Sequence, residues 1–319
     1  MKKSAIALCA GLMIASVLDQ GLARAEKALL KSIDIKANKT MLFDVVKFGD
    51  LLYAPGERGV ILRSPDNGNR WVGFSNVPTN RALTSIAFVD EKVIVVAGHG
   101  GSVFRTDDGG AEWQKIEIPE IGKDSILGIM KTADGKLFLC GAFGLFFESS
   151  DAGKSWAKRS IIDEGFDRHI SQVVELPNKS WFAVGESGTA AISNDAGMKW
   201  QKLNVGYEGS LFGVLPAKDG SILVYGMRGN VFRSADNGQT WSQIPIESKS
   251  AINSGAVSAD GTIALVGNNG LAVVSKDNGL SFKTVNTAES NPLSGVHITK
   301  DGALVYVGYL AVGVVHSAK

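Results

Sequence analysis

Short apolar runs recur along the chain between polar, glycine-rich turns, and their lengths predict strands. In one representative stretch, L-F-G-V-L at 211–215, S-I-L-V-Y at 221–225 and V-F-R at 231–233 follow one another closely. A polar turn then leads to W-S-Q-I-P-I at 241–246, where apolar and polar residues alternate as in a half-buried strand. Each unit is therefore predicted to contain four short strands. No segment after the first 25 residues has the pattern of a long helix.

The polar turn before the fourth run of each unit carries a repeated motif, Ser/Thr-x-Asp-x-Gly-x-x-Trp. Its first copy, S-P-D-N-G-N-R-W, starts at Ser64, and successive copies start 42, 43, 44, 41 and 41 residues further on. A fixed period of this size indicates a repeat architecture. Four-stranded units of about 40–45 residues are typical of β-propeller blades.

The motif residues are expected to build turns. Ser, Thr and Asp side chains hydrogen-bond nearby backbone amides, and Gly accepts a backbone conformation that side chains oppose. The aromatic residue is expected to pack between adjacent sheets. A calcium loop is not predicted, because no bidentate Glu follows at the required distance. The motif residues are Ser64, Asp66, Gly68, Trp71; Thr106, Asp108, Gly110, Trp113; Ser149, Asp151, Gly153, Trp156; Ser193, Asp195, Gly197, Trp200; Ser234, Asp236, Gly238, Trp241; and Ser275, Asp277, Gly279, Phe282.

A seventh unit is predicted from the two ends of the chain. Residues 303–315 match the second and third runs of the other units, and no motif follows them. Residues 27–34, K-A-L-L-K-S-I-D, alternate like the strand that follows each motif. The sequence therefore predicts an all-β, seven-bladed propeller of four-stranded antiparallel blades, whose last blade is completed by the N-terminal strand. Such closure leaves no open sheet edge around the ring.

The first 25 residues resemble a secretory signal peptide. Lys2 and Lys3 precede an apolar run at 5–17, and Ala23-Arg24-Ala25 fits a cleavage site. We expect residues 1–25 to be removed and residues 26–319 to form one propeller domain in the periplasm or outside the cell. An uncleaved anchor is the alternative, although the apolar run is short for a membrane span.

Charge and cysteine content narrow the classes of partner. Loss of residues 1–25 removes three of 33 basic and one of 32 acidic residues, which leaves 30 and 31. This balance does not suggest binding to nucleic acid or to an anionic membrane surface. Cys140 is the one cysteine after residue 25, so the exported chain cannot form an internal disulfide. We expect a monomer that is not inserted in the membrane after cleavage.

The repeated G-x-x-G turn and Asp motif resemble the bacterial neuraminidase repeat, or Asp-box. Over residues 26–319 the chain is most similar to the photosystem II stability and assembly factor family. This resemblance implies a seven-bladed propeller that assists membrane-protein assembly on the exported side. Relatives in bacteria without photosynthesis imply a second partner class, exporters of the resistance–nodulation–division type. Arg63, Arg105 and Arg233 match the family's arginine before the box, whereas Glu148, Ile192 and Val274 depart from it.

Enzymes that share the Asp-box are the main alternative, because sialidases are propellers with the same motif. They resemble one another in an F-R-I-P segment, an arginine triad and a Tyr–Glu pair, and F-R-I-P does not occur here. A glycoside-binding or glycoside-hydrolysing propeller stays open, since carboxylate separation cannot be read from sequence. His99, His169, His297 and His316 lack the spacing of a metal site. No catalytic residue, metal or cofactor is predicted.

Loops on a rigid scaffold are where binding residues usually lie. The turns between the second and third strands and the loops between blades should share one face, the mouth face. Arginine and aromatic residues are enriched in interfaces, so we predict a protein partner for this face. The family resemblance implies that the partner is a membrane protein, and a peptide- or lipid-binding role is a further alternative. The predicted residues are Arg58, Arg81, His99, Phe143, Arg168, His169, Met227, Arg228, Tyr309 and Leu310. The opposite face, with Arg63, Arg105 and Arg233, is the other candidate.

Overall fold

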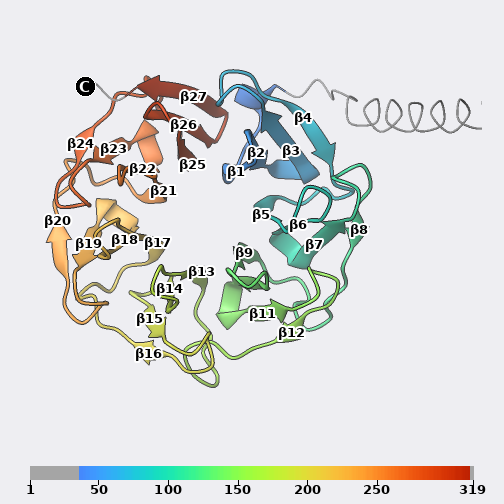
Figure 1. The fold of residues 1–319 in the computed structure, drawn as a ribbon, viewed down its shortest axis with the longest axis horizontal. Helices are drawn as coiled ribbons and strands as arrows, with labels where there is room; N and C mark the ends of the chain where they lie inside the picture. Colours follow the sequence, from blue (N-terminus) through green and yellow to red (C-terminus); the bar gives the residue numbers. More distant parts are fainter. Residues whose placement is uncertain (1–35, 317–319) are drawn as a thin grey trace, which may run out of the picture.

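A computed structural model describes residues 36–316, which form seven antiparallel sheets arranged as a ring (Figure 1). Strands β1, β5, β9, β13, β17, β21 and β25 surround the centre, and later strands of each sheet lie successively further out. Consecutive strands pair in chain order within every sheet. The seven-bladed propeller predicted from the sequence is confirmed.

The strands of the first four blades are short, as the apolar runs predict. Blade one contains β1 (Val46–Phe48), β2 (Leu51–Pro55), β3 (Val60–Ser64) and β4 (Val72–Asn76). Blade two contains β5 (Leu83–Phe88), β6 (Ile94–Gly98), β7 (Ser102–Thr106) and β8 (Gln114–Lys115). Blade three contains β9 (Ile126–Lys131), β10 (Leu137–Gly141), β11 (Phe146–Ser149) and β12 (Ala157–Lys158). Blade four contains β13 (Ile170–Glu175), β14 (Trp181–Gly185), β15 (Ala190–Ser193) and β16 (Gln201–Lys202).

The last three blades follow the same plan. Blade five contains β17 (Leu211–Pro216), β18 (Ile222–Gly226), β19 (Val231–Ser234) and β20 (Ser242–Ile244). Blade six contains β21 (Ile252–Val257), β22 (Ile263–Gly267), β23 (Ala272–Ser275) and β24 (Lys283–Thr284). Blade seven contains β25 (Leu293–Ile298), β26 (Ala303–Gly308) and β27 (Ala311–His316). Within residues 36–316 the helical elements are six 3₁₀ turns: η1 (Ala37–Lys39), η2 (Glu57–Gly59), η3 (His99–Gly101), η4 (Ala142–Gly144), η5 (Met227–Gly229) and η6 (Asn268–Gly270).

Each Asp-box forms the turn between the third and fourth strands. In blade five the Gly238 amide donates to Ser234 Oγ (2.8 Å), and Ser234 Oγ donates to Asp236 Oδ1 (2.7 Å). The Thr240 amide donates to the same carboxylate oxygen at 2.9 Å. Gly238 has φ +85°, and a Cβ there would lie 2.6 Å from Leu203 of the preceding blade. Equivalent hydrogen bonds recur in the other five boxes.

The hydrophobic core lies between neighbouring blades. One cluster joins Phe182 and Val184 of blade four to Leu211 and Val224 of blade five, and Trp241 of the fifth box packs against it. The Trp241 and Phe182 ring centroids are 6.1 Å apart in an edge-to-face arrangement. The box aromatic therefore joins two sheets, as the sequence predicts.

Blade seven meets blade one through residues 41–42. Met41 bridges to Tyr309, and the Leu42 amide donates to the Gly308 carbonyl at 3.1 Å. The described part of blade seven has three strands. The strand expected at 27–34 lies outside the described residues, so its place in the last blade stays a prediction. Within residues 36–316, no helix is long and apolar enough to cross a membrane.

Candidate partner-binding surface

The turns between second and third strands share an unusual backbone conformation. In six blades the third residue of the G-x-x-G turn, or its equivalent, has a positive φ without being glycine. Bulky side chains in this left-handed region cost about 1 kcal/mol or more each. The positions and φ values are Arg58 (55°), Phe143 (52°), Ser187 (54°), Arg228 (58°), Asn269 (58°) and Leu310 (53°), with Gly100 (68°) in blade two.

Most of the large apolar side chains exposed on the described residues lie at these turns. Phe143 is 61% exposed, Tyr309 47%, Met227 39% and Leu310 38%. The remaining two, Met198 and Leu280, lie in Asp-boxes. The side chain of Arg58 is 81% exposed. These side chains contribute little to the core, so folding alone does not explain them.

In five blades the loop that leaves the blade is hydrogen-bonded to the turn between the second and third strands of that blade. The Gly59 amide donates to the Arg81 carbonyl at 3.1 Å, and the Gly144 amide donates to the Arg168 carbonyl at 2.9 Å. A Cβ at Gly59 or Gly144 would clash with the backbone of its loop. The predicted residues in the turns and those in the loops between blades therefore lie on the same face of the ring, the mouth face.

Two histidines on the mouth face contact nearby side chains. His169 Nδ1 lies 3.3 Å from Glu186 Oε2, and the His169 ring meets the edge of Phe143 with centroids 4.9 Å apart. His99 similarly faces Phe43 at 6.0 Å. Arg81, Arg168 and Arg228 are exposed. The structure brings Phe143, Arg168 and His169 together, whereas Arg58, Arg228 and Tyr309 come from separate blades.

A cavity of about 290 Å³ opens beside this cluster and was not predicted from sequence. It is lined by Phe143, Phe166 and Leu145, with the acidic residues Glu120 and Glu164 also at its lining. A neighbouring cavity shares Phe166 and extends to Arg168 and Ser187. The only sequence signal for them is the length of the loop between β12 and β13.

The arginines that precede the boxes make structural contacts, and two of them reach the neighbouring blade. Arg105 is buried, and its Nε donates to the carbonyl of Ala152 in the next box at 2.7 Å. Arg233 Nε donates to the Asn278 carbonyl, also in the next box, at 2.9 Å. Arg63 lies over the Phe74 ring, 5.8 Å from its centroid. These contacts give the three residues a structural role, which weakens the alternative that they form a free binding patch.

Blade three is one of the three blades that lack this arginine, and it contacts the next box through an arginine that follows β12. Glu148 occupies the position in blade three and pairs with Lys136 at 2.8 Å. Glu148 also pairs with Arg159, whose guanidinium donates to the Gly197 carbonyl of the next box at 3.2 Å. An arginine thus reaches the next box although the sequence motif is absent.

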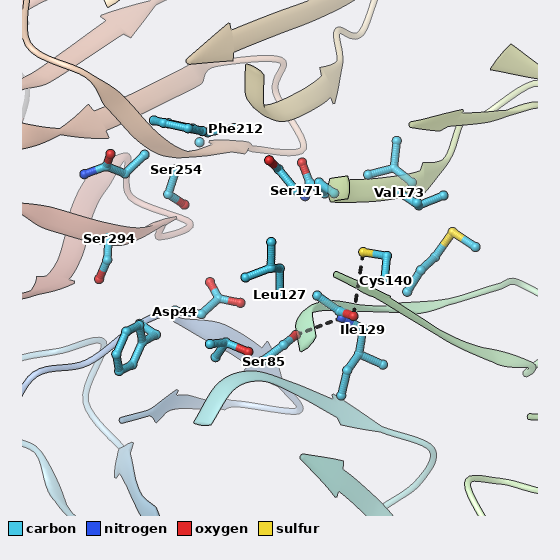
Figure 2. A pocket seen from close by; sticks show the side chains of 18 of the residues that line it. Asp44, Ser85, Leu127, Ile129, Cys140, Ser171, Val173, Phe212, Ser254 and Ser294 are labelled. Atoms are coloured by element: carbon cyan, nitrogen blue, oxygen red, sulfur yellow. Dashed lines mark hydrogen bonds between the residues drawn. The ribbon is translucent and has the colours of Figure 1, made fainter. Parts of the chain in front are cut away.

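The central channel forms a cavity of about 460 Å³ between the innermost strands (Figure 2). Asp44, a residue that sequence reasoning missed, directs its carboxylate into it. Burial raises the pKa of Asp44 to about 6, although the Val45 amide donates to Oδ1 at 2.7 Å and lowers it. Burial also raises the pKa of the Cys140 thiol to about 12, so this cysteine is not a reactive thiolate. No group of three or more potential metal ligands occurs within residues 36–316.

Comparison with known proteins connects this geometry to a family. A family model described as photosynthesis system II assembly factor YCF48 matches residues 120–242. No protein of curated function matches the chain by sequence. The matched region contains three boxes and the turns that present Phe143 and Arg228.

Solved structures share the fold at low sequence identity. One described as YCF48 bound to D1 peptide has a TM-score of 0.71 and 15% identity, covering 92% of this chain and 98% of its own. YCF48 from Cyanidioschyzon merolae has a TM-score of 0.69 and 15% identity, with 89% and 97% covered. A streptogramin B lyase has a TM-score of 0.72 and 12% identity, with 89% and 95% covered. The predicted resemblance to the photosystem II assembly factor family is therefore confirmed by sequence over residues 120–242. The solved structures share the fold of the whole ring.

Proposed function

We propose that this chain is an exported, non-enzymatic propeller that binds a membrane protein or a subunit of a membrane complex and assists its assembly. The observation that carries the proposal is the choice of residues at the strained turns. Arg58, Phe143, Arg228 and Leu310 occupy left-handed positions where glycine would be more stable, and they are exposed. Strain without a folding benefit is typical of positions kept for binding.

The chemistry of the mouth face supports a protein as the partner. Arginine and aromatic side chains supply most of the energy at protein interfaces. Here they surround cavities lined by Phe143 and Phe166, which would receive apolar side chains of a partner. A structure of a family member is described as bound to a D1 peptide, which supports a peptide segment of a membrane protein as the ligand class.

Capture of partners from membranes tests the proposal. The full-length protein, made with a C-terminal tag and allowed to mature in its host, is crosslinked mildly and purified from the membrane fraction. We expect membrane-complex subunits or exporter components to be recovered with it. The mature N-terminus should be Glu26 if residues 1–25 are a cleaved signal peptide. Recovery of oligosaccharide, or cleavage of a glycoside by the purified protein, would contradict the proposal.

A further inference from the structure

The innermost strands provide an internal comparison among the seven blades. In each of blades two to seven, the first residue of the innermost strand pairs with the last residue of the second strand, and a bulge follows. Leu42 pairs with Gly56 in the same way, and the Phe43 amide donates to the Pro55 carbonyl at 2.9 Å. The residue after the bulge is therefore equivalent in all blades. These residues are Asp44, Ser85, Gly128, Gln172, Gly213, Ser254 and Gly295.

Six of the seven equivalent residues are uncharged, so the propeller does not need an acid at this position. Asp44 is the exception, and it lines the central cavity together with Ser254 and Ser171. Figure 2 shows its carboxylate directed into the cavity, with Ser85 and Leu127 nearby and Phe212 across the opening. Asp44 is half-buried in the channel, and a carboxylate held there without a cationic partner is less well stabilised than one in open water. Stability of the fold alone therefore does not explain an aspartate at this position.

The other ionisable groups of the cavity do not neutralise Asp44. Lys131 donates to the carbonyls of Phe88 (2.8 Å) and Val89 (3.0 Å). Glu175 accepts from the Ala133 amide at 2.7 Å and pairs with Lys179. The remaining two ionisable groups of the lining are the buried Cys140 thiol and the Tyr225 phenol, which is uncharged at neutral pH. Within the described residues, no lysine or arginine forms an ion pair with Asp44.

We propose that the central channel binds an ammonium group, with Asp44 as its counter-ion. Phe43 and Phe212 line the cavity and would offer ring faces to the cation. The hydroxyls of Ser171 and Ser254 can accept the remaining N–H hydrogens. A Ca²⁺ or Mg²⁺ ion fits less well, because these ions prefer six or more oxygen ligands and this layer supplies one carboxylate. This proposal is independent of the protein partner that we propose for the mouth face.

Binding of simple amines to the purified protein tests this site. Calorimetry at about pH 7, where the α-amino group and Asp44 are both mostly charged, would compare n-butylammonium with the uncharged 1-pentanol, and tetraalanine amide with its N-acetylated form. We expect the cationic member of at least one pair to bind at least about tenfold more tightly. Binding of butylammonium indicates a small-molecule amine, and binding of the free peptide alone indicates a chain terminus.

Two variants and one pH series make the test specific. Asp44→Asn should abolish the preference for the cation, whereas Asp50→Asn, an exposed acid in the β1–β2 turn, should keep it. If Asp44→Asn does not fold, the parent protein still provides the test. Its affinity for the cation should fall about tenfold from pH 8 to pH 5, because the pKa of Asp44 is about 6. Equal affinity for charged and uncharged probes, or an unchanged preference in Asp44→Asn, would overturn the proposal.

Discussion

Ser294 Oγ donates a hydrogen bond to the Leu42 carbonyl at 2.5 Å, although the two residues are 252 positions apart in the chain. The same contact occurs between consecutive blades, where Thr84 Oγ1 donates to the Ile126 carbonyl at 2.8 Å. Between blades six and seven, Asn253 Nδ2 donates to the Leu293 carbonyl, also at 2.8 Å. The contact between the last and first blades therefore repeats the ordinary contact between neighbours. The ring is closed at its inner layer by residues 41–42.

Ser294→Ala should lower the free energy of unfolding by about 1 kcal/mol, because it leaves the Leu42 carbonyl without its donor. Urea denaturation measures the change. Ser171→Ala is the matched control, since Ser171 follows the first residue of β13 as Ser294 follows that of β25. Equal effects of the two substitutions would show that the contact between the first and last blades contributes no particular stability.

Deletion of residues 27–35 tests whether the N-terminal segment completes blade seven. We expect a large drop in melting temperature and aggregation, because β27 would then present an unpaired edge. Removal of residues 317–319 is the control for trimming a terminus. A 27–35 deletion that melts with the parent protein would mean that the last blade does not depend on this segment.

Ser234→Ala should destabilise the fold by about 1–3 kcal/mol, because the Gly238 amide is buried and loses its acceptor. The exposed Ser242 provides a control substitution to Ala with little expected effect. Calcium at millimolar concentration should leave the melting temperature of the parent protein unchanged. A calcium-dependent rise would contradict the structural interpretation of the Asp-boxes.

Acid should weaken the boxes in a defined pH range. Hydrogen bonds from the Thr240 side chain and amide, and from Ser234, lower the pKa of Asp236 from 3.8 to about 2. A carboxylate whose pKa is lowered by folding stabilises the protein above its unfolded pKa. That stability is lost as pH falls from about 4 to about 2. Melting temperatures across this range should fall more steeply for the parent than for Asp236→Asn. Parallel curves would show that this box does not contribute to acid sensitivity.

The sequence predicted the ring because the period of about 42 residues and the alternation of apolar residues can both be read along the chain, without knowledge of contacts between distant residues. It also placed Trp241 between sheets, since each box precedes a fourth strand. It did not predict that Arg105 is buried, because its acceptor, Ala152, lies in the next repeat. Asp44 was missed because it precedes the first box, and only the pairing of Leu42 with Gly56 shows its register. The strained φ of Phe143 likewise depends on the turn conformation and not on residue type.

The central claim is that the mouth-face turns are kept for binding at the expense of stability. Combined substitution of Phe143, Arg228 and Leu310 by Gly removes three exposed side chains at left-handed positions. The variant should melt at the temperature of the parent protein or above it, because glycine accepts this backbone conformation. The control combines Lys115→Ala, Gln201→Ala and Lys283→Ala on the exposed outer strands β8, β16 and β24.

The decisive measurement is the affinity of both variants for the membrane-protein partner captured from the host, determined with purified components beside their melting temperatures. The account predicts that the glycine variant is folded and binds at least about tenfold more weakly, since loss of one interface anchor can remove about 2 kcal/mol. The control variant should bind like the parent protein. A glycine variant that is folded and binds the partner with unchanged affinity would contradict the account.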